Sequence, residues 1–388
     1  MLLTYKYRIY PTQEQEFWLF YVLEHLRQLH NSARLNRIRA YEEGRFVSYQ
    51  EQSKILTEAR NRHADFKEIP QDFQNHALRR VDKAFANFQR RLKQGFNKPG
   101  FPRYRRRIRS LTFSLRKRKD KHENRVRENP IIETDTRLDR LKIPKLGEVK
   151  IRMSRPLIGD PKEVSIVKKA SGWYAHISCD IGDIPKVEPT DAIAVDMGTT
   201  QYLTTSEGEP IANPKWYRNA EGLTKKHNKD LSRKQLGSKR WQKQKHKLAR
   251  HHEHITNKRK DFIGKLVYKL FHHYNNNVLV SEDLQVSNMI KNKHLSKSIS
   301  DASWATFFEW CASIAERDGL HYHKVNPRNT SQICSSCGVK SPKQLSLAVR
   351  TFRCANCDKA IDRDHNAARN ILYRAAEALR GERWVTDL

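Results

Sequence analysis

Acidic residues are scarce in this chain relative to basic ones. Its 388 residues include 43 Asp and Glu but 75 Lys and Arg, so the formal net charge is +32. An excess of this size repels itself unless a polyanion neutralises it, which indicates nucleic acid as the partner. The basic residues are spread over the whole chain instead of forming one juxtamembrane cluster, so we do not expect a membrane surface to be that polyanion.

Long apolar runs are also missing. No run approaches the roughly 18 residues that span a bilayer, and the stretch MLLTYKYRIYPTQEQ meets charge too early for a signal peptide. Six cysteines in a chain of this length are too few for a disulfide scaffold. These absences exclude the membrane-spanning and disulfide-rich classes, and we expect a reducing compartment, the cytoplasm.

The N-terminal half begins with a short strand pattern, TYKYRIY at residues 4–10, which ends at Pro11. Apolar residues then recur at helical spacing over residues 12–94. Two helix starts carry capping-box pairs, Thr12 with Gln15 and Ser48 with Glu51. Residues 12–94 are therefore predicted to form a small helical domain.

A period of two replaces the helical period after the Gly/Pro-rich break at residues 95–107. It recurs near residues 111–115, 149–153 and 173–181, which predicts strands, and the polar residues 116–140 between them are expected to form a long loop. We expect the first strand to join the same sheet. We predict a β-barrel-like domain, residues 1–11 and 95–185, into which the helical domain is inserted.

The C-terminal half, residues 190–388, is predicted to be a third, mixed α/β domain. The stretches AIAVDMG and NVLVSEDL are apolar and read as buried strands that end in acids. Residues 215–274 are densely basic and helical in pattern, with Gly237-Ser238 dividing them into two arms. An amphipathic helix is expected over residues 301–317, and a last helix from Asn366.

Four cysteines have the spacing of a metal site. Cys334-x-x-Cys337 and Cys354-x-x-Cys357 are separated by 16 residues, which lies within the range of four-cysteine zinc ribbons. A site with four thiolates has no open coordination position, so the predicted Zn²⁺ is structural. Two dithiols without metal, or a redox pair, are the competing interpretations.

Three acids stand at the ends of predicted elements: Asp196, Glu282 and Asp364. Any one of them alone is more often a turn former or a helix cap. Together they occupy the positions at which an RNase H-like sheet collects its carboxylates. Clustered carboxylates fit hard cations, and two Mg²⁺ or Mn²⁺ ions on oxygen ligands are a device for phosphodiester hydrolysis. The pattern therefore predicts metal-dependent cleavage of nucleic acid.

Five ordered motifs carry a family resemblance: VDMGTT (195–200), VSEDLQV (280–286), DASW (301–304), TSQICSSCG (330–338) and DRDHNAARN (362–370). The chain resembles the TnpB family of IS200/IS605-type transposons, relatives of the Cas12 nucleases of type V CRISPR systems. The resemblance is dense over residues 190–373 and looser before them. One departure, Met197-Gly198-Thr199-Thr200, leaves the acid and the glycine in place.

The resemblance implies an architecture and a function. The β-barrel-like part would be a WED domain, the inserted helices a REC domain, and residues 190–388 a RuvC nuclease domain with basic arms at 215–274 and a zinc ribbon inserted at 330–360. Asp196, Glu282 and Asp364 match the three RuvC acids, and Asp283 would be a supporting residue. Such proteins use a guide RNA transcribed from the transposon end, require a short target-adjacent motif and cleave double-stranded DNA at one site. We expect a monomer.

Two basic segments are the candidate nucleic-acid contacts. The first precedes the strands and continues into residues 116–119; the second is on the predicted arms. The candidate residues are Arg103, Arg105, Arg106, Arg107, Arg109, Lys225, Lys226, Lys229, Arg233, Lys234, Lys239, Arg240 and Lys243. Scattered cations of this kind suit the backbone of an RNA–DNA duplex. The alternative is that these residues only form a solvent-exposed face and bind no nucleic acid.

Three other functions compete with a guided nuclease. A homologue that binds guide and target without cleaving would act as a repressor, but the three acids are all present. A miniature type V effector would share every motif. A transposase that uses a Tyr nucleophile would need a metal-binding His pair, and no such constellation stands out in the sequence.

Overall fold

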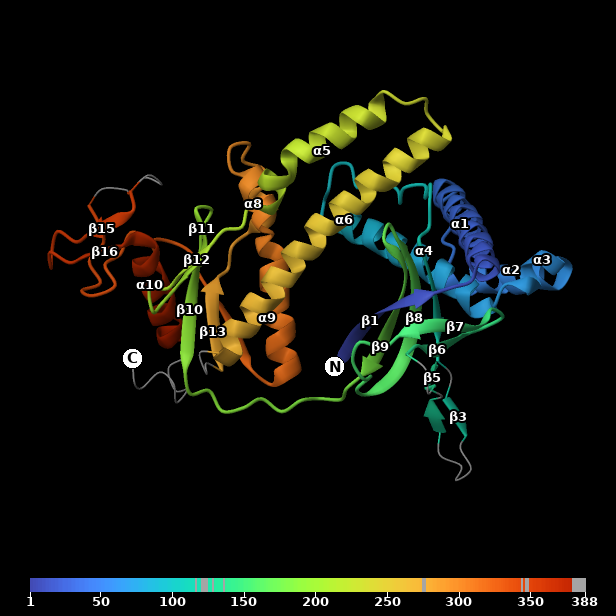
Figure 1. The fold of residues 1–388 in the computed structure, drawn as a ribbon, viewed down its shortest axis with the longest axis horizontal. Coiled ribbons are helices and arrows are strands. Elements are labelled where there is room, and N and C mark those ends of the chain that lie inside the picture. Colours follow the sequence, from blue (N-terminus) through green and yellow to red (C-terminus); the bar gives the residue numbers. More distant parts are fainter. Residues whose placement is uncertain are drawn as a thin grey trace. The chain divides into compact units, whose positions relative to one another are not determined.

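The computed structural model describes residues 1–378 except 116, 120–124, 128, 135–136, 274–276, 343–344 and 346–348. The chain divides into two units, Met1–Gly182 and Asp183–Leu388 (Figure 1). No helix among the described residues is both long enough and apolar enough to cross a membrane.

The N-terminal unit contains an antiparallel sheet of seven strands. In hydrogen-bonded order they are β2 (Ser110–Ser114), β8 (Asp160–Lys169), β9 (Gly172–Asp180), β1 (Leu2–Tyr10), β7 (Gly147–Arg152), β6 (Asp139–Ile143) and β5 (Ile131–Ile132). The first strand of the chain therefore lies in the middle of the sheet, between β9 and β7. As expected, it pairs with strands that come after the helices, more than 130 residues further along the chain than β1 itself.

Four helices separate β1 from the rest of this sheet: α1 (Gln13–Glu42), α2 (Tyr49–Arg62), α3 (Ala64–Glu68) and α4 (Gln71–Lys93). Both predicted capping boxes form, at Thr12 and at Ser48. Leu19 of α1 and Phe73 of α4 are fully buried in the same core as the sheet residues. Helices and sheet in this unit thus share one apolar core.

The expectation of a long loop over residues 116–140 is wrong. A hairpin of β3 (Lys117–Lys119) and β4 (Arg125–Arg127) lies there, followed by β5 and the start of β6. The sequences KRK and RVR have no continuous apolar face, so the alternation that marks a strand is absent. Backbone pairing forms this hairpin without a pattern that the sequence could show.

The C-terminal unit contains a mixed five-stranded sheet. Its strands, in spatial order, are β12 (Pro210–Ala212), β11 (Gln201–Thr205), β10 (Ala192–Met197), β13 (Val278–Glu282) and β14 (His321–Val325). The neighbours β10, β13 and β14 run parallel, and β11 and β12 are antiparallel additions. The carboxyl ends of the three parallel strands therefore meet at one edge.

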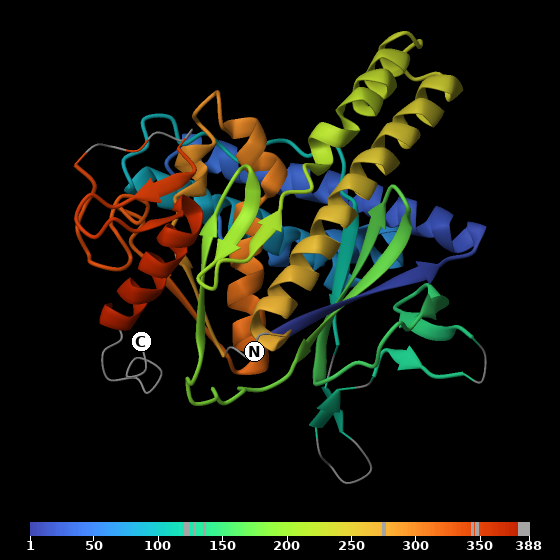
Figure 2. The ribbon, with the colours of Figure 1, turned by 60° about the vertical axis from the view of Figure 1, so that its left-hand side comes forward.

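Helices cover both faces of this sheet. They are α5 (Trp216–Ser232), α6 (Lys239–Tyr268) with a π-helical continuation (Lys269–His273), α7 (Val286–Met289), α8 (Ser296–Ala302), α9 (Trp304–Asp318) and α10 (Arg363–Ala378). Side chains of α6 and α9 pack on one face, and those of α10 pack on the other. Figure 2 shows α5 and α6 as a paired helical hairpin that extends away from the sheet. A small hairpin of β15 (Thr351–Arg353) and β16 (Ala360–Asp362) precedes α10.

Two glycines inside the long helices of this unit differ in their surroundings. A Cβ placed on Gly264 of α6 would lie 2.4 Å from Cζ3 of Trp310 on α9, so the close approach of these helices depends on the missing side chain. A Cβ on Gly222 of α5 would have no heavy atom within 4 Å. One glycine is needed for packing, and the other is not.

We predict opposite stability effects for Gly264→Ala and Gly222→Ala. Alanine improves helix propensity by about 1 kcal/mol at either position, but at Gly264 overpacking costs about 1–3 kcal/mol and outweighs that gain. Thermal unfolding should show a lower Tm for Gly264→Ala and an unchanged or higher Tm for Gly222→Ala. Equal shifts in the two variants would contradict the packing argument.

Candidate nuclease site and metal centre

Strand register brings Asp196 and Glu282 to the same edge and the same face of the C-terminal sheet. Val195 is paired with Ser281 in the parallel β10–β13 ladder, so the next residues, Asp196 and Glu282, are lateral neighbours. Side chains alternate between faces along a strand. Ala194 and Val280, two residues earlier in each strand, pack against α10, which places both carboxylates on the face that α10 covers.

The third acid, Asp364, is in the first turn of α10. The carboxylate of Asp362 accepts hydrogen bonds from the backbone N–H groups of Asp364 (2.9 Å) and His365 (3.0 Å), so Asp362 caps the helix. The Asp364 side chain is therefore not used as a cap. The two acids of the D-R-D motif have separate roles, and the one next to the helix cap remains available as a ligand.

The three carboxylates act on one another electrostatically. Burial, followed by the charges of Glu282 and Asp364, raises the pKa of Asp196 well above its ordinary value. Burial also raises the pKa of Glu282, although a hydrogen bond from Thr330 opposes that shift. Carboxyl groups held close together disfavour one another's ionisation, and a nearby cation removes this electrostatic cost.

Two arginines contact Asp364. Its carboxylate is 3.2 Å from Nη2 of Arg363 and 3.4 Å from Nη1 of Arg350, and Nη2 of Arg350 also donates to Oγ1 of Thr200 at 2.7 Å. Among the described residues, the three acids do not form a group whose oxygens all lie within 4.8 Å of one another. Guanidinium groups thus neutralise part of the acidic charge. The sequence patterns had given no reason to single out Arg350.

Glu282 is fixed by the loop that enters the cysteine motif. The hydroxyl of Thr330 donates to Oε1 of Glu282 at 2.5 Å, and both residues are buried. The Thr330 carbonyl accepts a hydrogen bond from Nδ2 of Asn370 at 2.8 Å. Thr330 therefore connects the second acid to the helix that carries the third. It belongs to the TSQICSSCG motif, but its spacing alone did not point to this contact.

The four predicted cysteines converge. Their Sγ atoms all lie within 4.8 Å of one another, with 3.7 Å between Cys334 and Cys357 and 3.5 Å between Cys337 and Cys354. Four thiolates about 2.3 Å from one zinc ion would be roughly 3.8 Å apart at tetrahedral geometry. The donor type and the spacing fit a structural Zn²⁺. Cys179 and Cys311 are fully buried in apolar cores elsewhere.

Both cysteine pairs lie in the same kind of tight turn. The backbone N–H of Cys334 bonds to the Val339 carbonyl, and that of Cys354 to the Lys359 carbonyl, each at 3.0 Å. The residue after the second cysteine of each pair has positive φ, +72° at Gly338 and +54° at Asp358. Glycine takes this conformation without strain, whereas Asp358 adopts it at a cost.

Two buried asparagines join the first cysteine turn to α10. Asn366 accepts from the backbone N–H of Ser335 (2.9 Å) and donates to the Ile333 carbonyl (2.7 Å). Asn370, one helical turn later, donates to that same carbonyl at 2.7 Å. The ribbon is thus attached to α10, the helix that carries Asp364, by side-chain hydrogen bonds as well as by the chain itself.

The predicted nucleic-acid contacts are exposed in both units. Arg103, Arg105, Arg106, Arg107 and Arg109 are all exposed, and Asn31 of α1 holds the backbone of Arg105 through two hydrogen bonds. This segment therefore follows a helix as well as the sheet. Residue 116 and the side chains of 117–119 lie outside the described part.

On the arms, every candidate except the half-buried Lys234 is exposed, namely Lys225, Lys226, Lys229, Arg233, Lys239, Arg240 and Lys243. Polar contacts join the arms. Thr224 of α5 bonds to His251 of α6 at 3.0 Å, and Gln244 bonds to His227 at 3.1 Å. The hairpin thus presents cations to solvent around a polar interior.

Comparison with known proteins identifies the class of fold. The family profile OrfB_IS605, described as "Probable transposase", matches residues 176–293, and "Cas12f1-like, TNB domain" matches residues 304–371. A solved Cas12f1–sgRNA–target DNA complex has a chain with a TM-score of 0.59 to this one at 13% identity, covering 96% of this chain and 98% of that one. At that identity the likeness concerns the fold. The C-terminal unit is a RuvC-like domain with an inserted zinc-ribbon module.

Full-length relatives then identify the family. A candidate RNA-guided DNA endonuclease of Streptomyces pristinaespiralis is 34% identical over 378 residues, which cover 95% of this chain and 88% of that protein. InsQ of Escherichia coli (strain K12), also named as a candidate RNA-guided DNA endonuclease, is 28% identical over 396 residues, with 96% and 92% covered. The chain belongs to the TnpB family.

A third profile, described as "Helix-turn-helix domain", matches residues 1–45. The structure has strand β1 and one continuous 30-residue helix, α1, over that range. A helix-turn-helix needs two helices joined by a short turn. This part of the chain therefore does not fold as the description suggests.

Cys354→Ser should cause loss of metal and loosen the start of α10. The substitution removes one of four thiolates, and the ribbon contacts α10 through Asn366 and Asn370. We expect bound zinc, measured by mass spectrometry, to fall from one equivalent to near zero, and hydrogen exchange to rise at Asp364. Ser336→Ala, an exposed position in the same motif, is the control. Full zinc content in Cys354→Ser would contradict the structural assignment.

Thr330→Val should destabilise the C-terminal unit while Thr330→Ser should not. Valine keeps the shape of threonine but leaves the buried Glu282 carboxylate without its 2.5 Å donor, a loss worth about 1–3 kcal/mol. Serine keeps the hydroxyl. Urea unfolding of the two variants at neutral pH measures the difference, and equal free energies of unfolding would rule out the hydrogen bond as a stabilising contact.

Proposed function

We propose that this protein is an RNA-guided DNA endonuclease whose nuclease centre consists of Asp196, Glu282 and Asp364. The observation that carries the proposal is the convergence of these carboxylates at the carboxyl edge of β10 and β13, under the first turn of α10. Burial raises the pKa of the first two, and for Asp196 the charges of Glu282 and Asp364 add to that shift. A purely structural role would not require three carboxylates to be held where their charges repel one another.

The donor set fits hard divalent cations. The three side chains offer only oxygen ligands, and their unfavourable charge is relieved by a cation at the same edge. We infer that Asp196, Glu282 and Asp364 hold Mg²⁺ or Mn²⁺. Such ions, when bound, supply an activated water and stabilise the leaving oxygen of a phosphodiester.

Residues around the acids have positioning roles in this proposal. Thr330 orients Glu282 through its hydroxyl, and Asp362 caps α10 so that Asp364 is free to act as a ligand. Arg350 and Arg363 pair with Asp364 and would have to share it with a cation. The four cysteines would hold Zn²⁺, which maintains the ribbon and does not take part in the reaction.

Nucleic acid is the proposed partner in two forms, a guide RNA and a double-stranded target DNA. The names of the full-length relatives support guidance by RNA. The net charge of +32 supports a large polyanionic ligand, and the exposed cations of residues 103–109 and of the α5–α6 hairpin suit contacts to a duplex backbone. We propose that these surfaces hold the guide and the guide–target duplex.

The proposal can be tested with protein co-expressed with the DNA that flanks its gene. RNA that co-purifies would be sequenced, and the complex would be mixed with a plasmid library in which the matching target adjoins randomised bases. Depletion of plasmids that share one flanking motif, only when Mg²⁺ is present, is the expected result. A specific RNA without any cleavage would favour the non-cleaving repressor instead.

Asp196→Ala should abolish cleavage and spare guided target binding. The change removes a proposed metal ligand and no basic contact, so the cleavage rate should fall by about a thousandfold or more, while the target Kd measured in EDTA should stay within error of the wild type. Asp191→Ala removes an exposed acid just before the same strand and should leave both quantities unchanged. Loss of target binding by Asp196→Ala would contradict the assigned role.

A further inference from the structure

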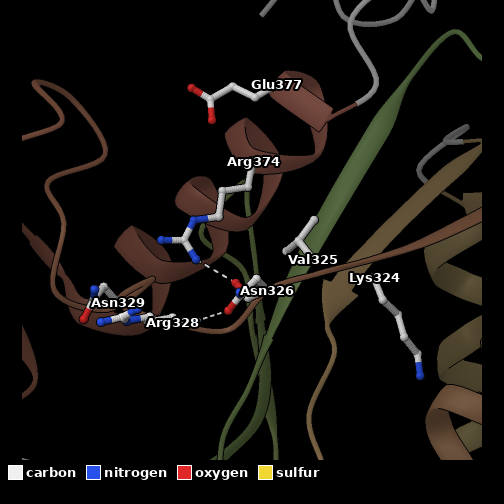
Figure 3. A pocket seen from close by; sticks show the side chains of 7 residues that line it. All are labelled: Lys324, Val325, Asn326, Arg328, Asn329, Arg374 and Glu377. Carbon is white, nitrogen blue, oxygen red and sulfur yellow. Dashed lines mark hydrogen bonds between the residues drawn. The ribbon is translucent and has the colours of Figure 1, made fainter.

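A cationic pocket lies beside the second acid of the proposed nuclease centre. It has a volume of about 600 Å³ and is lined by the end of β14, the loop that follows it and the last turns of α10 (Figure 3). Its polar lining residues are Lys324, Asn326, Arg328, Asn329, Arg374 and Glu377. Arg328 and Arg374 are the cations of the pocket, whereas the Lys324 side chain points away from them (Figure 3) and its Nζ lies 5.3 Å from the ring centroid of Phe308 on the other face of the sheet. None of the described residues that line the pocket is aromatic.

Neither of these two cations has an acidic partner among the described residues. Lys324 is 3.5 Å from the carboxylate of Asp283, whereas neither Arg328 nor Arg374 forms an ion pair with a carboxylate in the described part of the chain. Arg374 donates from Nη1 to the Asn326 carbonyl at 2.6 Å, and the Asn326 side chain accepts from the backbone N–H of Arg328 at 2.9 Å. Figure 3 shows both bonds. They hold the loop in place while the charges remain available to an anion.

Strand register fixes the distance of this pocket from the acids. Val325, which lines it, is paired directly with Glu282 across β13 and β14, so their backbones are about 4.8 Å apart. Both side chains point to the face that α10 covers, where Val325 packs against the helix. The charge of Arg374 also acts to lower the pKa of Glu282. The pocket is thus the immediate neighbour of the nuclease centre.

We propose that this pocket binds a phosphate of the DNA strand being cut, next to the phosphate that reacts. This inference rests on the proposed endonuclease function and adds a substrate subsite to it. Guanidinium groups suit the planar, bidentate recognition of phosphate. The described lining residues offer no aromatic ring on which a base could stack. The subsite therefore holds the backbone irrespective of base sequence and keeps the strand in register with Glu282.

Arg328→Gln is the variant that tests the subsite most cleanly. The Arg328 side chain makes no hydrogen bond in the described structure, so its loss leaves the loop intact, whereas Arg374 also supports Asn326. Losing one charge-assisted contact should slow guided cleavage about tenfold or more, with no change in target affinity in EDTA. Glu377→Gln removes the one acid among the described residues of the lining. This variant should have the opposite effect on cleavage, which should then tolerate more salt. Lys186→Gln, an exposed residue of the linker, is the charge-matched control.

A neutral methylphosphonate placed at each position near the cut completes the test. In the wild type, one position beside the cut should slow cleavage about as much as Arg328→Gln does. In Arg328→Gln the same substitution should add nothing, because the contact is already lost. Additive effects at every position, or an Arg328→Gln rate equal to that of Lys186→Gln, would overturn the subsite and leave the proposed function standing. A wild-type complex that binds its target with Mg²⁺ and never cuts would overturn both.

Discussion

The repulsion among three carboxylates is the constraint on which the C-terminal unit is built. Asp196 and Glu282 stand at the ends of neighbouring parallel strands, so strand pairing holds the two side chains next to each other. The preceding residues on the same face, Ala194 and Val280, are buried in the core and fix the strands there. The third, Asp364, is brought over the same edge by α10. The raised pKa of Asp196, caused by burial and then by the charges of Glu282 and Asp364, reflects this unfavourable arrangement, and such arrangements are typical of functional sites.

One helix carries the parts that manage this charge. From its first turn to its last, α10 presents Asp364 to the acids, Asn366 and Asn370 to the cysteine turn, and Arg374 to the cationic pocket. Asn366, Asn370 and Arg374 are four residues apart and therefore lie on one side of the helix, whereas Asp364, two residues before Asn366, lies on another side of its first turn. The cysteine ribbon is connected to Glu282 through the same helix, by way of Asn370 and Thr330. The cysteine turn and the proposed catalytic site are thereby linked through Thr330 and Asn370.

The sequence predicted the parts that depend on local pattern. Strand ends rich in acid, two C-x-x-C pairs and capping boxes are signals contained within a few residues, and each was found where expected. The partners of these residues could not be found in that way. Arg350, Thr330 and Arg374 come close to the acids only through the fold, and nothing in the motifs around Thr330 and Arg374 indicated these contacts. The β3–β4 hairpin was missed for a related reason, since its strand sequences KRK and RVR contain no sustained alternation of apolar and polar residues.

The route of the chain through the ribbon also bears on how such proteins change in length. The ribbon segment leaves the sheet after β14 and returns directly into α10. It is attached to that helix at two points, Thr330, whose carbonyl accepts from Asn370, and Arg350, whose carbonyl accepts from the backbone N–H of Arg363. Residues added or deleted between these two anchors therefore do not displace Asp364. A single residue inserted within α10 would instead rotate the following part of the helix by about 100°. Insertions and deletions should therefore accumulate between Thr330 and Arg350 and not within α10.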